Sequence, residues 1–186
     1  MRLAIPAALT AVALLAGCSD KPRSEPLAGG NETCVGSFLM GSVQRSANAC
    51  TACGNAEEQL AIDGVRDSYG YAYQAGGTYT LRAIAPNGVL FPAGNFAGAL
   101  MRIPTAYSPG TTWTISSLRG GAVQESRTPA NADGDDPAIP SGADDYYGFI
   151  TSMDFDAVEF TVTGGSSDAV NLADDPVRFY EFCGQR

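Results

Sequence analysis

A short alternating pattern of apolar and polar residues, repeated along the chain, is the feature that most limits the fold. In Ala157–Thr163 the apolar residues Val158, Phe160 and Val162 alternate with polar ones. Alternation with a period of two is typical of a half-buried antiparallel strand. The remaining predicted strands are Thr78–Ala83, Ala99–Ile103, Thr112–Ser116, Ala122–Ser126, Tyr147–Thr151 and Val177–Cys183.

Turn residues separate these segments, for example Pro86-Asn87-Gly88 and Gly120-Gly121. The one stretch with helical character is Asn55–Ala61, and Asn131–Asp145 is predicted as a long acidic surface loop. Trp113 lies in an alternating segment and is predicted to be a core residue. Many short strands with almost no helix predict an all-β fold, a single antiparallel β-sandwich or jelly roll.

The N-terminus has the layout of an export signal. Arg2 is followed by an apolar run from Leu3 to Ala16, which is shorter than the roughly 20 residues of a membrane span. The segment Leu15-Ala16-Gly17-Cys18 resembles the lipobox of bacterial lipoproteins. The resemblance implies cleavage before Cys18 and a diacylglycerol on its thiol. The alternative is an ordinary secretory peptide in which Cys18 has no role.

These features predict three regions: a signal peptide over residues 1–17, a lipidated tether over 18–33 and a β-sandwich domain over 34–186. The tether combines two prolines, a Gly-Gly pair and charges, a composition that cannot form a core. Acyl chains on Cys18 would make the membrane a partner and place the protein in the cell envelope. Ser19 in place of an aspartate favours the outer membrane over the inner one.

Charge and residue content exclude several functions. The chain has 11 basic and 20 acidic residues and no histidine, for a net charge of −9. Removing residues 1–17 takes away one basic residue and no acidic one, so the net charge becomes −10. This balance argues against a nucleic-acid partner. Without histidine, Ser-His-Asp and Cys-His mechanisms and histidine-bound metals are excluded.

We therefore predict a protein that is not an enzyme. The remaining catalytic alternative is a glycosidase, which needs a pair of carboxylates. Asp154, Asp156 and Glu159 could supply such a pair. Glu159, however, falls on the polar face of its strand, where an acidic side chain needs no catalytic role.

Four cysteines besides Cys18 remain in the exported chain. Export favours disulfides, and the preferred pairing is Cys34 with Cys183 and Cys50 with Cys53. A four-thiolate zinc site is one alternative, and a redox role for the Cys50-Thr51-Ala52-Cys53 motif is another.

Several motifs between residues 50 and 183 carry a family resemblance. With the Cys50-x-x-Cys53 pair, they are similar to an exported bacterial β-sandwich module of surface and envelope proteins. The stretch from Ala61 to Ser68 also resembles the start of discoidin-like, galactose-binding-type jelly rolls. This second resemblance implies a structural calcium site at the Asp-Gly turn. The other motifs are Ala93–Gly98, Gly121–Ser126 and Phe155–Glu159.

The residues of this turn suit a calcium ion on chemical grounds as well. Asp63 and Asp67 could converge on one Ca²⁺, which takes 6–8 oxygen ligands. The alternative is that Asp63 caps a turn with its side chain. A second acidic segment, Asn131–Asp136, lacks the glycine and glutamate of an EF-hand loop, which favours a solvated surface loop.

Two functions remain open. The first is a binding module for a glycan or a protein partner, with Tyr69, Tyr71, Tyr146 and Tyr147 as ligand contacts. The alternative for these tyrosines is a place at the edge of the core with their hydroxyls in water. The second function is a purely structural or assembly lipoprotein.

Overall fold

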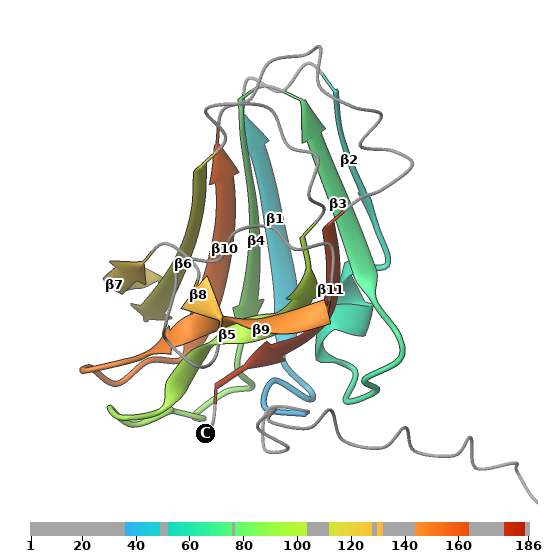
Figure 1. Ribbon diagram of the computed structural model, residues 1–186. Helices are drawn as coiled ribbons and strands as arrows, with labels where there is room; N and C mark the ends of the chain where they lie inside the picture. The colour runs from blue at the N-terminus through green and yellow to red at the C-terminus, as the bar shows by residue number, and fades with distance from the viewer. Residues whose placement is uncertain are drawn as a thin grey trace, which may run out of the picture.

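The computed structural model describes residues 36–48, 52–75, 77–103, 112–127, 130–131, 144–163 and 177–184. These residues form two antiparallel sheets (Figure 1). Sheet A has the order β1-β4-β10-β6-β7 and sheet B the order β2-β3-β11-β5-β9-β8. In Figure 1, β5, β9 and β11 cross in front of β4 and β10. The strands are β1 Ser42–Asn48, β2 Ala52–Ala56, β3 Gly70–Ala75, β4 Thr78–Ile84, β5 Phe96–Arg102, β6 Thr112–Arg119, β7 Ala122–Arg127, β8 Ala130–Asn131, β9 Asp144–Ile150, β10 Ala157–Thr163 and β11 Val177–Cys183.

The all-β sandwich predicted from the alternating segments is confirmed. β10 matches its prediction residue for residue, and both glycines of the Gly120-Gly121 turn have positive φ. The helical prediction for Asn55–Ala61 is wrong in its bounds. Ala52–Ala56 is strand β2, because it pairs with β3, and the short 3-10 helix η2 covers Glu58–Ile62.

The prediction of a loop over Asn131–Asp145 is wrong at both ends. Asn131 belongs to β8, and β9 already begins at Asp144. The intervening residues, the predicted signal peptide, Cys18 and the tether all lie outside the described residues. No helix in the described ranges is both long enough and apolar enough to cross a bilayer.

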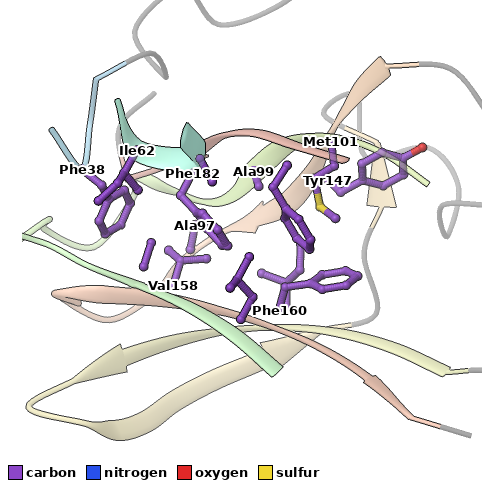
Figure 2. Packing of buried hydrophobic residues seen from close by; sticks show 14 of the residues in the cluster. Phe38, Ile62, Ala97, Ala99, Met101, Tyr147, Val158, Phe160 and Phe182 are labelled. Carbon is purple, nitrogen blue, oxygen red and sulfur yellow. The ribbon is translucent and has the colours of Figure 1, made fainter. Parts of the chain in front are cut away.

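The core lies between the two sheets. β10 contributes Val158 and Phe160, which face residues such as Ala97 and Ala99 of sheet B (Figure 2). The Phe160 ring packs edge-on against Phe179 at 5.3 Å and lies 5.6 Å from Trp113, which is 9% exposed. The prediction that Trp113 belongs to the core is therefore confirmed.

The outer face of sheet A is polar and its side chains satisfy one another. Between β4 and β10, Thr80 Oγ1 lies 3.2 Å from Thr161 Oγ1. Two positions along, Arg82 Nε donates to Glu159 Oε2 at 2.7 Å. Cross-strand pairs of this kind stabilise a solvent-facing sheet surface.

Candidate functional site

The outer face of sheet B is built differently, because it carries a second apolar cluster. Phe96, Leu100, Tyr146 and Tyr180 pack there together with Cys183, and Tyr69 lies against them. The inner face of the same strands belongs to the main core, so β5 is buried on both sides. Burial on both faces removes the alternating pattern from the sequence.

A pair of glycines makes room for this cluster. Gly98 of β5 is directly opposite Gly148 of β9. A Cβ on Gly98 would lie 2.5 Å from the Phe96 ring, and one on Gly148 equally close. The ring therefore lies across the glycine pair.

A row of polar and aromatic residues crosses this face toward one end of the sheet. The strand registers place Tyr71 of β3 opposite Arg178 of β11, Arg178 opposite Arg102 of β5, and Arg102 opposite Asp144 of β9. Residues directly opposite each other in an antiparallel pair share a face, with Cβ atoms about 4.5–5.5 Å apart. We call Tyr71, Arg178, Arg102 and Asp144 the arginine row.

Tyr69 and Tyr180 adjoin this row. The Arg178 guanidinium lies 5.0 Å from the centre of the Tyr69 ring, a cation–π arrangement. Tyr69 packs edge-on against Tyr180 at 5.5 Å, and the Tyr180 hydroxyl donates to Asp144 Oδ1 at 3.0 Å. Burial, and then the charge and hydrogen bond of Asp144, raise the pKa of Tyr180. The hydroxyl therefore keeps its proton and acts as a donor.

Three arginines at this face have nitrogens buried without a hydrogen-bond partner. They are Arg102 Nε, Arg178 Nε and Arg66 Nη2. Arg66 belongs to the loop between η2 and β3, and its charge acts on Tyr146, whose pKa is raised mainly by burial. Each of these buried donors lacks the hydrogen bond that ordinarily offsets its desolvation.

The predicted ligand tyrosines divide between surface and core. Tyr69 and Tyr71 are half-buried on the outer face of sheet B. Tyr146 is 4% exposed, and Tyr147 is 1% exposed in the main core, at whose edge its hydroxyl points away from the cluster (Figure 2). Neither of these two rings is exposed as a ligand contact requires, because alternation in β9 sends them into the two apolar clusters. Arg102, Arg178 and Tyr180 were not among the predicted site residues.

A buried carboxylate lies on the same face, nearer the other end of β11. Glu181 has no exposed surface; it accepts from Gly64 N at 2.5 Å and from Gly36 N at 3.4 Å. Burial raises the pKa of Glu181 to about 7, the two N–H groups oppose the rise, and the nearby Asp63 carboxylate adds to it. Glu181 thus fixes two loops onto sheet B.

Asp63 caps a turn with its side chain, as the alternative to a calcium ligand predicted. Val65 N donates to Asp63 Oδ1 and the Ser68 hydroxyl donates to Asp63 Oδ2, both at 2.7 Å. Within the described segments no group of three or more Cys, Asp and Glu residues could hold a metal ion. The calcium site at Asp63 and Asp67 stays a prediction.

The cysteines are described only in part. Cys183 is fully buried and disulfide-bonded. Cys34 and Cys50 lie outside the described residues, and Cys53 is described only as a position in β2. The pairing of Cys34 with Cys183 and of Cys50 with Cys53 stays a prediction.

The three carboxylates considered for a glycosidase each have a protein partner. Asp154 accepts from Ala93 N at 3.0 Å, and Asp156 accepts from Gly120 N at 2.9 Å. Glu159 is held by Arg82. Each contact ties a loop or a strand pair together.

No protein-family model and no curated protein matches the chain. Two solved structures are similar to it at 14% identity. The first is a chitosan-binding module of a chitosanase/glucanase from Paenibacillus sp. IK-5, with a TM-score of 0.46 over 80% of this chain and 96% of that one. The second is the module CBM32-3 of a family 31 glycoside hydrolase from Clostridium perfringens, with a TM-score of 0.45 over 87% of this chain and 100% of that one.

Proposed function

We propose that the protein is a lipid-anchored, non-catalytic module of the cell envelope that binds a glycan on the outer face of sheet B. The observation that carries the proposal is the arginine row with Tyr69 beside it: two half-buried tyrosines lie beside two arginines that form no ion pair with a described residue. The polar face of sheet A has no such combination among its described residues.

The chemistry of this face suits a sugar. Tyrosine offers an apolar ring that packs against the C–H face of a pyranose, together with a hydroxyl for hydrogen bonding. Arg102 and Arg178 supply donors to sugar oxygens, and Asp144 supplies an acceptor. Because these residues lie on paired strands, their backbone is already ordered and binding costs little conformational entropy.

Changing Tyr71 tests this site. In the mature lipoprotein held in detergent micelles, we expect Tyr71→Ala to weaken binding on a glycan array about 10-fold or more, because stacking area is lost. Tyr71→Phe keeps the ring and should retain most of the binding, so it serves as the matched control. Absence of binding to every glycan, with an envelope protein co-purifying equally with all variants, would support the structural alternative instead.

Lipid anchoring is tested at Cys18. We expect Cys18→Ser to abolish incorporation of labelled palmitate and to move the protein from the membrane fraction to the soluble fraction, because no thiol remains to be acylated. Ser19→Ala is the control and should leave both readouts unchanged. Membrane association that persists in the Cys18 variant would contradict the anchor.

A further inference from the structure

We propose that Arg102 and Arg178 bind the acid group of an anionic glycan, a sugar that carries a carboxylate or a phosphate. The proposal rests on the glycan-binding function above and names the class of sugar that the site takes. The acid group would lie between the two guanidinium groups, with the sugar ring toward the tyrosines.

The arginines of the described residues divide into two groups. Four form ion pairs with a carboxylate: Arg45 with Glu58, Arg82 with Glu159, Arg119 with Asp154 and Arg127 with Glu125. Arg66, Arg102 and Arg178 form none with a described residue. These same three have buried nitrogens without a partner, and all three lie at the outer face of sheet B.

The positions of Arg102 and Arg178 are unfavourable unless an anion neutralises the two charges. They are directly opposite each other on neighbouring strands. Like charges at opposite positions of an antiparallel pair destabilise the sheet. Burial of both Nε atoms without a hydrogen-bond partner adds a desolvation penalty. In a chain with nearly twice as many acidic as basic residues, two adjacent arginines without an ion pair to any described residue are unusual.

Asp144, the acidic residue of the arginine row, does not neutralise these two charges. Asp144 is opposite Arg102, but Oδ1 accepts from the Tyr180 hydroxyl, and no ion pair joins Asp144 to the described arginines. An external oxyanion would neutralise the two arginines, because the planar fork of arginine binds carboxylates and phosphates through two parallel hydrogen bonds. Tyr69, beside Arg178, supplies a ring surface that favours a sugar over an acidic peptide.

Calorimetry on the mature lipoprotein in detergent tests the proposal. The probes are a galacturonate oligomer, the same oligomer with its carboxyls reduced to alcohols, a phosphorylated mannan and poly-glutamate. We expect the galacturonate oligomer or the phosphorylated mannan to bind at least about 10-fold more tightly than the reduced oligomer, as charged hydrogen bonds predict. The tighter of the two identifies the oxyanion. Binding should weaken as salt rises.

The variants Arg102→Gln and Arg178→Gln should each remove that preference and most of the salt dependence. Arg119→Gln, which removes the same charge from sheet A, is the matched control and should leave binding unchanged. Without ligand, Arg102→Gln should melt no lower than the wild type, because a repulsive pair has been removed; Arg178→Gln also loses the contact with the Tyr69 ring.

Four results would overturn the proposal. Equal binding of the acidic and the reduced oligomers would leave glycan binding intact and exclude the acid-specific site. Tight binding of poly-glutamate alone would point to an acidic protein partner. If Arg119→Gln weakened binding as much as Arg102→Gln and Arg178→Gln do, the effect would be one of overall charge only. Failure of every sugar to bind would overturn the glycan-binding function itself.

Discussion

Replacing Cys34 by serine is expected to lower the free energy of unfolding by about 5 kcal/mol, the largest effect of any change considered. The expectation rests on the predicted bond between Cys34 and Cys183. A crosslink that closes about 150 residues restricts the unfolded chain strongly, and the loop-entropy estimate gives roughly 5 kcal/mol for it. Cys183 is disulfide-bonded and fully buried, so its side of the bond is supported by packing.

Urea unfolding under oxidising conditions measures the effect. Cys50→Ser is the matched control: if Cys50 pairs locally with Cys53, its loss should destabilise far less, because a four-residue loop restricts the unfolded chain little. Tryptic mapping without reduction gives the pairing directly. A peptide that joins Cys34 to Cys50 or to Cys53 would contradict the prediction, as would equal destabilisation by the two changes.

The predicted bounds coincide with the structure for β10, which is buried on one face, and also for β11, which is buried on both. β10 alternates clearly because its outer side chains meet a polar ladder on sheet A. β5 and β11 are buried almost throughout, since the loop between η2 and β3 and the Phe96 ring cover their outer side. A strand covered on both faces loses its alternation, so the bounds predicted for β5 were displaced.

The candidate site was harder to predict for a different reason. Tyr69 and Tyr71 were found because tyrosines near loops are recognisable in a sequence. Arg102 and Arg178 come from distant segments, and only the register of β5 with β11 brings them together. The pairing of β11 with β5 contains a bulge between Phe179 and Glu181, and no local sequence pattern predicted it.

Glu181→Ala is the second change with a large expected effect, a loss of about 3 kcal/mol or more in the free energy of unfolding. The carboxylate accepts from the part-buried Gly64 N and Gly36 N, and a donor left without a partner costs about 1–3 kcal/mol when it is buried. The change also leaves a cavity at a fully buried position. Glu181→Gln keeps one carbonyl acceptor and nearly the same volume, so it should destabilise less. Chemical unfolding in the presence of a chelator measures both. Equal loss in the two variants would show that the hydrogen bonds to the glycines contribute nothing.

The same residue predicts how stability changes with pH in the presence of a chelator. The folded state holds the pKa of Glu181 at about 7, above the ordinary value of 4.5, mainly through burial. Below pH 4.5 the side chain is protonated in both states. Between 4.5 and 7 the folded state binds a proton that the unfolded state has lost, so stability falls as pH rises. The total fall is about 3 kcal/mol, at 1.36 kcal/mol per unit.

Glu181→Gln should remove that slope, and stability in this variant should be nearly flat over the same range. Repeating the wild-type series in millimolar Ca²⁺ tests the predicted site at Asp63 and Asp67. A bound cation next to Glu181 would favour its charged form, so calcium should raise the melting temperature most at pH 7 and reduce the slope. A melting temperature that is the same in calcium and in chelator at pH 7 would exclude a structural ion. A wild-type slope that survives Glu181→Gln would assign the pH dependence to another group.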